Sequence, residues 1–224
     1  MTENYQQIRS RVQAAIAKSP YRQNVTMLAV SKTQPIEKIR ALYQLGHRDF
    51  GENYVQELIE KAQKLQESCP EIRWHFIGHL QSNKVKQLLP YVQFVHSVDS
   101  VKLAKELSKR QAEAGQYERL DIYLQVNLDG ESSKSGVTSD QAPTVCAEIA
   151  KLPGLNLLGL MCIPDPQAIA SVPSPFARLK QLEQTCQPHT RGYLSMGMSS
   201  DFEEAIREGA TIVRLGTIIF GTRS

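Results

Sequence analysis

Short apolar runs alternate with amphipathic stretches along almost the whole chain. The first run, 26–31, is apolar nearly throughout, which is typical of a strand in a parallel sheet that is covered on both faces. The pattern predicts seven further strands, at 47–50, 73–76, 92–95, 120–126, 155–162, 193–195 and 211–215. It predicts helices at 6–18, 35–46, 54–65, 83–89, 101–114, 142–152, 176–184 and 201–208.

Strict alternation of strands and helices predicts right-handed βαβ units and a parallel sheet. About eight such units in 224 residues fit a (β/α)8 barrel. The helix at 6–18 precedes the first strand and is additional. An open doubly wound sheet is the alternative, but the turn after the first strand lacks the glycine-rich phosphate loop of such folds. We therefore expect an α/β protein with one domain over residues 1–224, a single (β/α)8 TIM barrel.

Composition and charge exclude several classes of protein. The chain has 26 Lys and Arg against 23 Asp and Glu, too even a balance for a dedicated nucleic-acid binder. Hydrophobic residues make up 41%, so the chain is neither disordered nor fibrous. No apolar run approaches the ~18 residues of a membrane span, and the first residues lack the pattern of a secretory signal. We expect a cytoplasmic protein that binds neither nucleic acid nor membrane.

The metal-ligand residue types show no arrangement typical of a metal site. The cysteines are Cys69, Cys146, Cys162 and Cys186, with no C-x-x-C pair. Buried, reduced thiols are the expected state, which fits the cytoplasm. His75 and His79 are four positions apart, but they straddle a predicted strand end rather than lying on a helix, so we expect no metal there.

Residues that follow the strands are the candidates for chemistry, because a barrel places its active site at the carboxyl ends of its strands. Lys32 follows the first strand, directly behind an apolar segment. Burial favours the neutral amine, which is a nucleophile toward carbonyls. A lysine that extends to solvent is the alternative.

A phosphate site is predicted after the seventh and eighth strands, the usual place in this fold. Ser199 and Ser200 supply hydroxyls at a helix start, whose free N–H groups suit an anion. Gly216 lets the backbone come close, and Thr217 adds a donor. The same Ser-Ser-Asp segment is also a good helix N-cap, and a capped helix can still bind phosphate.

Three further polar residues are placed near the predicted mouth. Arg214 lies in an apolar run at the end of the eighth strand. A buried arginine needs a partner, which would be a ring nitrogen or a phosphate of a ligand. A surface ion pair is the alternative. Asn53 follows the second strand, although such residues also occur in ordinary loops. Lys134 is either a second amine or a solvated loop lysine.

A lysine opposite a phosphate site, with an arginine alongside, is explained by an imine to a phosphorylated aldehyde. Pyridoxal 5′-phosphate provides an aldehyde for Lys32, a phosphate for the two loops and a pyridine nitrogen for Arg214. A Schiff-base aldolase that acts on a sugar phosphate is the alternative.

A series of motifs along almost the whole chain carries a family resemblance. They are LAVSK at 28–32, FGENY at 50–54, WHFIG at 74–78, LQSNK at 80–84, HSVD at 96–99, KSG at 134–136, GLM at 159–161, LSMGMSSD at 194–201, VRLGT at 213–217 and IFG at 219–221. In these motifs the sequence resembles the pyridoxal phosphate homeostasis proteins, also described as proline synthetase co-transcribed homologues.

The resemblance implies a barrel like the amino-terminal domain of alanine racemase, fold type III of the pyridoxal phosphate proteins. It implies that Lys32 is the Schiff-base lysine and that Arg214 faces the pyridine nitrogen. Asn53 matches a position near the cofactor. The residues that match the phosphate site are Ser199, Ser200, Gly216 and Thr217.

The family is known for binding the cofactor without an established catalytic activity, and it is credited with maintaining intracellular vitamin B6 and amino-acid balance. The resemblance therefore implies a non-enzymatic carrier of pyridoxal phosphate that supplies recipient apo-enzymes. We expect a monomer, and a dimer through the barrel helices is the alternative. A regulatory protein that reports vitamin status is a further reading.

A small single-domain amino-acid racemase or lyase is the enzymatic alternative. Racemisation needs an acid or base on each face of a planar intermediate. In two-domain racemases the second group comes from a β domain of on the order of 100 residues. The sequence runs three residues beyond Gly221, so we expect no such domain. Arg214 would also keep the ring nitrogen unprotonated, because a like charge there is unfavourable.

Overall fold

A computed structural model describes residues 2–114, 118–130 and 135–221. Lys134, the second candidate amine, lies outside these residues. None of the helices within these ranges combines the length and the apolar composition that a membrane crossing needs.

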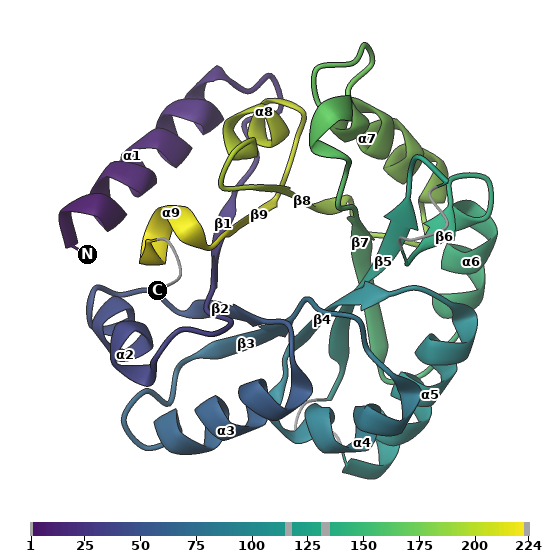
Figure 1. Cartoon of the computed structure of the whole chain (residues 1–224). Helices are drawn as coiled ribbons and strands as arrows, with labels where there is room; N and C mark the ends of the chain where they lie inside the picture. Colours follow the sequence, from purple (N-terminus) through teal and green to yellow (C-terminus); the bar gives the residue numbers. More distant parts are fainter. Residues whose placement is uncertain (1, 115–117, 131–134, 222–224) are drawn as a thin grey trace.

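Eight parallel strands close into a barrel in which the first strand pairs directly with the last (Figure 1). Around the ring they are β1 Thr26–Val30, β2 Asp49–Glu52, β3 Arg73–Phe76, β4 Phe94–Val98, β5 Leu120–Asn127, β7 Leu155–Met161, β8 Tyr193–Met198 and β9 Ile212–Leu215. The two-residue strand β6, Val137–Thr138, pairs with the end of β5 outside the ring. The predicted (β/α)8 barrel is confirmed.

Helices surround the strands and cover the outer face of the barrel (Figure 1). They are α1 Thr2–Lys18, α2 Ile36–Gln44, α3 Val55–Leu65, α4 Val85–Leu88, α5 Val101–Ala114, α6 Ala142–Ile149, α7 Pro175–Cys186, α8 Phe202–Arg207 and α9 Thr217–Phe220, with the 3-10 turns η1 Ser82–Lys84, η2 Leu89–Tyr91 and η3 Pro166–Ala168. The additional helix α1 packs against α8, where Arg11 and Glu203 form an ion pair of 2.9 Å.

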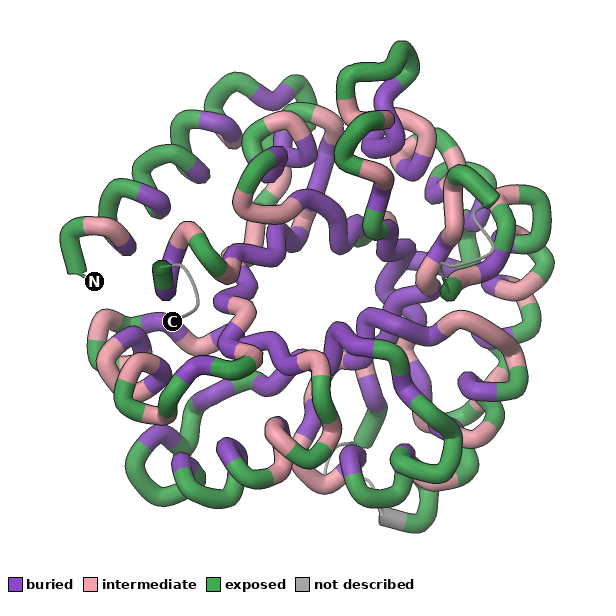
Figure 2. Tube along the Cα trace, in the orientation of Figure 1, coloured by how far each residue is buried: buried purple, intermediate pink, exposed green. Residues whose placement is uncertain are grey.

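The buried residues form two layers, because successive side chains of a strand point to opposite faces. The larger layer fills the space between strands and helices and includes Phe50, Trp74 and Phe76. The smaller one lies inside the barrel and consists of Leu28, Ile77, Tyr123, Leu158, Met161 and Ile212. Figure 2 shows the inner ring mostly buried and the outer helix faces exposed.

Two strands lie about two residues later than predicted. The second was predicted at 47–50 and spans Asp49–Glu52, because His47 still belongs to the turn that ends α2, with its N–H bonded to Leu42 O at 3.2 Å. The fourth was predicted at 92–95 and spans Phe94–Val98. The predicted helix at 83–89 is divided into η1, α4 and η2, with Pro90 near the start of η2. The short helix α9 was not predicted.

Candidate functional site

A cavity of about 470 Å³ opens at the carboxyl ends of β1, β8 and β9. Its lining residues are Val30, Lys32, Gln34, Asn53, Ile77, Ile163, Met198, Ser199, Ser200, Arg214, Gly216, Thr217 and Gly221. Seven of the eight candidates therefore line one cavity, and the eighth, Lys134, lies outside the described residues. Their roles toward a ligand remain predictions.

The residues on both sides of Lys32 are held by two carboxylates, those of Glu52 and Glu57. Ser31 precedes it, and the Ser31 hydroxyl donates to Glu52 Oε1 at 2.6 Å. Thr33 follows it and donates its backbone N–H to Glu57 Oε1 at 2.5 Å. Thr33 has φ +61°, a left-handed conformation that β-branched residues rarely adopt and that persists only where the surroundings enforce it. The half-buried Lys32 thus projects from a tightly fixed turn.

Lys61 of α3 joins these contacts into one cluster. Its Nζ lies 2.8 Å from Glu52 Oε1, 2.7 Å from Glu57 Oε1 and 2.6 Å from the carbonyl oxygen of Ser31. Glu52 is completely buried, and burial raises the pKa of its carboxyl while the ammonium of Lys61 opposes the rise. The cluster lies between β2 and α3, behind the turn that carries Lys32, and stabilises that turn.

Asn53 directly follows β2 at the edge of the cavity. Its Oδ1 is buried and has no hydrogen-bond partner among the described residues. Gly78 allows the close approach here, since a Cβ on that residue would lie 2.0 Å from Asn53 O. Asn53 therefore presents an unused acceptor on a fixed backbone.

Ser199 connects the loops that follow β8 and β9. Its Oγ accepts a hydrogen bond from the backbone N–H of Gly216 at 3.3 Å. Accepting this bond leaves the hydroxyl able to donate its own proton to a ligand. A Cβ at Gly216 would meet Val30 at 3.6 Å, an ordinary van der Waals distance, so packing within the chain does not require glycine there.

Asp201 shapes the loop after β8 in a way that the sequence analysis missed. Its carboxylate accepts from the N–H of Met198 at 2.6 Å and from the hydroxyl of Ser200 at 2.9 Å. Asp201 is the N-cap residue of α8, as the Ser-Ser-Asp segment indicates, but its side chain makes no hydrogen bond to the helix. The Ser200 hydroxyl donates its proton to Asp201 and has none left for a ligand, whereas the Ser199 hydroxyl keeps its proton available.

Arg214 is a buried cation bonded to neutral oxygens. Its Nη1 donates to Ser195 O at 2.8 Å and to Ser195 Oγ at 3.0 Å, and its Nη2 donates to Cys162 O at 2.9 Å. No carboxylate in the described part of the chain forms a salt bridge with it, so a surface ion pair is excluded. Burial lowers the pKa of Arg214, but arginine's ordinary pKa is so high that it stays charged. The cavity therefore contains a positive charge that is paired directly with no carboxylate of the described residues, although Asp201 interacts with it from a greater distance.

His75 and His96 lie inside the barrel and connect to Arg214 through Ser195. His96 Nδ1 lies 2.8 Å from Ser195 Oγ, and His75 Nδ1 lies 3.0 Å from His96 Nε2. His79, which is four positions from His75 in sequence, does not join this pair: its side chain is exposed and its Nδ1 lies 3.7 Å from Asp99 Oδ2. The sequence signal for His75 and His96 is that each is a polar residue at an inward-facing position of its strand, β3 or β4. Across the described ranges, no group of three His, Cys, Asp or Glu residues has the arrangement of a metal site.

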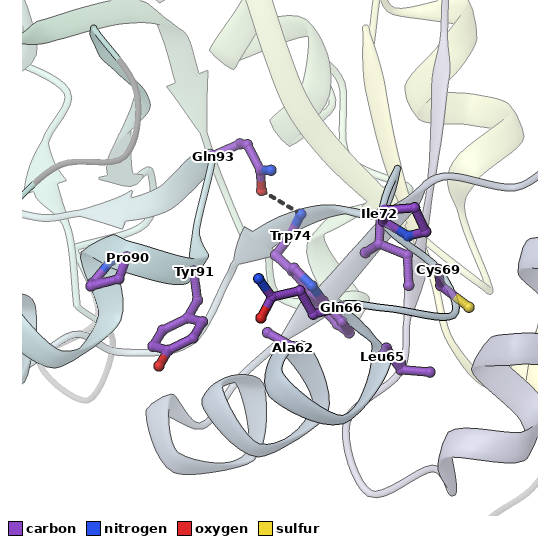
Figure 3. A pocket seen from close by; sticks show the side chains of 10 residues that line it. Ala62, Leu65, Gln66, Cys69, Ile72, Trp74, Pro90, Tyr91 and Gln93 are labelled. Carbon is purple, nitrogen blue, oxygen red and sulfur yellow. Dashed lines mark hydrogen bonds between the residues drawn. The ribbon is translucent and has the colours of Figure 1, made fainter.

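A second cavity, of about 120 Å³, lies beside α3 and the start of β3 (Figure 3). Gln93 Oε1 accepts from the backbone N–H of Trp74 at its edge, at 2.7 Å. Cys69 is the one thiol in its lining, which contains no charged side chain, so the cavity is unsuited to a phosphate. All four cysteines are buried and free, as expected.

Comparison with known proteins agrees with the barrel and the motifs. A sequence profile of the alanine racemase N-terminal domain matches residues 2–224. The pyridoxal phosphate homeostasis protein of Pseudomonas aeruginosa is 44% identical over 225 residues, which are 100% of this chain and 96% of that protein. The chain belongs to the pyridoxal phosphate homeostasis protein family. The Homo sapiens pyridoxal phosphate homeostasis protein is 42% identical over 231 residues, covering 96% of this chain and 84% of its own.

Solved structures of two kinds are similar in fold to this chain. PipY of Synechococcus elongatus PCC7942, solved with PLP bound, is 35% identical with a TM-score of 0.83, over 95% of this chain and 99% of PipY. An alanine racemase from Clostridium difficile 630 is 12% identical with a TM-score of 0.74, over 96% of this chain and 56% of the racemase. The second likeness is one of fold alone.

Proposed function

We propose that this protein binds pyridoxal 5′-phosphate in the cavity at the carboxyl ends of its strands and holds it on Lys32 as a Schiff base. One observation carries the proposal: the same cavity joins an amine, a buried guanidinium and the hydroxyl and backbone donors of two loops. The names of the family members and the PipY structure with PLP bound support it.

The cavity suits the cofactor in size and in chemistry. Its volume of about 470 Å³ falls within the usual range for small-molecule sites. Lys32 supplies the amine for the aldehyde, and Arg214 supplies donors for the ring nitrogen. Asn53 supplies an acceptor whose Oδ1 has no partner in the described structure. The phosphate side consists of Ser199, Ser200, Gly216 and Thr217. Bound pyridoxal phosphate supplies a reactive aldehyde and an electron-accepting ring.

The lining favours a carrier over a racemase. Racemisation needs an acid or base on each face of a planar intermediate. Among the described residues that line the cavity, Lys32 is the one ordinary acid–base group, since the lining contains no Asp, Glu, His, Cys or Tyr. We therefore propose that the protein maintains intracellular pyridoxal phosphate without a catalytic activity of its own.

The finer features of this role belong to the same proposal. The protein acts as a monomer with one domain over residues 1–224 and passes the cofactor to recipient apo-enzymes. Its location is the cytoplasm, and four buried reduced thiols support this.

The first experiment is the absorbance spectrum of the purified protein before and after borohydride, with mass mapping of its peptides. We expect a band near ~420 nm that borohydride removes, leaving the cofactor fixed on the peptide that contains Lys32. A colourless protein that takes up no added pyridoxal phosphate would overturn the assignment.

The second experiment separates carrier from enzyme. We expect the loaded protein to restore the activity of a pyridoxal phosphate apo-enzyme and to leave α-protons of amino acids unexchanged in deuterated water. Exchange with any amino acid of a broad panel would establish the racemase or lyase instead, and failure to deliver the cofactor would remove the carrier role.

A further inference from the structure

A continuous line of hydrogen bonds crosses the interior of the barrel from Arg214 to Asp49. Arg214 Nη1 lies 3.0 Å from Ser195 Oγ, which lies 2.8 Å from His96 Nδ1. His96 Nε2 lies 3.0 Å from His75 Nδ1, and His75 Nε2 lies 3.0 Å from Asp49 Oδ1. The five residues are no more than 7% exposed. The line therefore joins the cavity to the amino ends of β2 and β3 through the barrel.

The two ends of the line fix the direction of every bond in it. The Arg214 guanidinium can only donate, so Ser195 Oγ accepts a hydrogen bond from it. The Ser195 hydroxyl then donates its own hydrogen bond to His96 Nδ1. His96 then carries its proton on Nε2 and donates it to His75, and His75 donates from its Nε2 to Asp49. Asp49 also pairs with Arg73 at 2.5 Å, and the contacts with His75 and Arg73 outweigh burial and lower its pKa, so it is an ionised acceptor.

Both imidazoles are neutral in this arrangement. Burial lowers the pKa of His75 and of His96, in agreement with neutral rings. The opposite direction would place an unprotonated nitrogen of His75 against the carboxylate of Asp49 and leave the Ser195 proton without an acceptor. One set of proton positions therefore satisfies all the bonds, and each bond strengthens the next because the acceptors are polarised in series.

We propose that Ser195, His96, His75 and Asp49 are positioning residues that direct Arg214 toward the ring nitrogen of pyridoxal phosphate. The inference rests on the proposed function. Three hydrogen bonds to Ser195 and Cys162 hold the guanidinium. A guanidinium has five N–H groups, so at least two remain for a ligand. The line terminates on an anion at the far end of the barrel, which makes Ser195 Oγ a stronger acceptor and fixes the direction in which those two donors point.

The test is a comparison of two serines and two ligands. Ser195→Ala removes the hydroxyl that links Arg214 to His96 but keeps the backbone carbonyl that Arg214 also uses. Ser97→Ala is the matched control: Ser97 lies beside His96 on β4, is 1% exposed, and its hydroxyl has no partner among the described residues. The ligands are pyridoxal phosphate and its 1-deaza analogue, in which a C–H group replaces the ring nitrogen. Affinity is measured by equilibrium titration.

We expect Ser195→Ala to weaken binding of pyridoxal phosphate by about tenfold, the equivalent of one charge-assisted hydrogen bond. Binding of the deaza analogue should change by less than about twofold, because it has no ring nitrogen for Arg214 to contact. Ser97→Ala should leave both affinities unchanged within the same limit. Asp49→Asn, at the distant end of the line, should cause a smaller loss with the same preference for the nitrogen-containing ligand.

Three results would overturn the inference. Equal losses for both ligands in Ser195→Ala would show a merely structural role. Equal affinities of Ser195→Ala and Ser97→Ala for both ligands would show that the line of hydrogen bonds does not contribute to cofactor binding, while leaving the proposed function intact. Failure of the unaltered protein to bind either ligand would overturn the proposed function, and the inference with it.

Discussion

Lys61 and Glu52 form a salt bridge of 2.8 Å in which 7% of the lysine side chain and none of the glutamate side chain is exposed. The same Lys61 ammonium donates to the carbonyl oxygen of Ser31, the residue before the candidate nucleophile. A buried pair of this kind contributes little net stability, but removing one partner leaves an uncompensated charge. Its effect on the protein is therefore to hold Lys32 in place.

Replacing Lys61 should destabilise the protein and disturb the site together. We expect Lys61→Met to lower the free energy of unfolding by about 3 kcal/mol, because Glu52 and Glu57 lose their shared cation. Urea unfolding measures this change. Lys64→Met, on the exposed face of α3, is the matched control and should change stability by less than about 0.5 kcal/mol.

Removing the second charge separates the electrostatic effect from lost packing. The double variant Lys61→Met/Glu52→Gln should recover at least about 1 kcal/mol of the loss, since the buried carboxylate is gone. If the double variant is as unstable as Lys61→Met alone, the loss comes from packing rather than from charge.

Replacing Lys32 should remove the covalent attachment of the cofactor without unfolding the barrel. We expect Lys32→Ala to lose the absorbance band that borohydride removes and to keep the far-ultraviolet circular dichroism of the unaltered protein. Lys84→Ala, an exposed lysine on η1, should keep both signals. A collapse of the circular dichroism in Lys32→Ala would instead make this lysine a structural residue.

The two serines of the β8 loop should contribute unequally to phosphate binding. Ser199 accepts from Gly216 and retains a proton to donate, whereas Ser200 donates its proton to Asp201. We expect Ser199→Ala to weaken binding of pyridoxal phosphate by about fivefold, the equivalent of one hydrogen bond of about 1 kcal/mol, and Ser200→Ala to weaken it less. Equilibrium titration of both variants checks the order, and the reverse order would contradict it.

Acid should destabilise the protein through His47. Its Nε2 donates to Asp49 O at 2.8 Å and its Nδ1 accepts from the Tyr5 hydroxyl at 2.9 Å. Burial lowers the pKa of His47 to about 4, so the unfolded chain takes up a proton below pH ~6.5 while the folded chain stays neutral. Stability is therefore complete above pH ~6.5 and falls between pH ~6.5 and ~4, by about 3 kcal/mol from this residue.

Urea unfolding at a series of pH values measures the slope that His47 causes. We expect His47→Gln to have a shallower dependence on pH than the unaltered protein, and His189→Gln, at an exposed position, to keep the original slope. Parallel curves for His47→Gln and the unaltered protein would show that other groups cause the acid sensitivity.

The barrel could be predicted because its periodicity is local. Each strand and each helix carries its own apolar pattern, and β3 and α5 have the predicted bounds. The candidates at the strand ends also come together, because closing the ring brings all carboxyl ends to one face. Register was harder to predict: at β2 the apolar pattern does not distinguish His47, which completes a turn, from Asp49, which begins the strand.

The interactions between the candidates could not be predicted, because they join residues far apart in sequence. Ser195 and His96 are 99 positions apart and meet across the barrel interior. Asp201 reads as a helix cap in sequence, yet its carboxylate turns back to Met198 and Ser200. Such choices depend on which donor lies nearest after folding, and a local pattern contains no information about that.

The pairing of β1 with β9 has a consequence for how the cavity arises during synthesis. Thr26 pairs with Ile212 and Leu28 pairs with Arg214, so the first and last strands of the barrel form one seam (Figure 1). Lys32 lies on one side of that seam, and Ser199 and Thr217 lie on the other. A chain still on the ribosome has made its candidate nucleophile long before the loops that face it. Docking of β9 completes the barrel and the cavity together. A ligand that contacts both sides of the cavity therefore stabilises the pairing of β1 with β9.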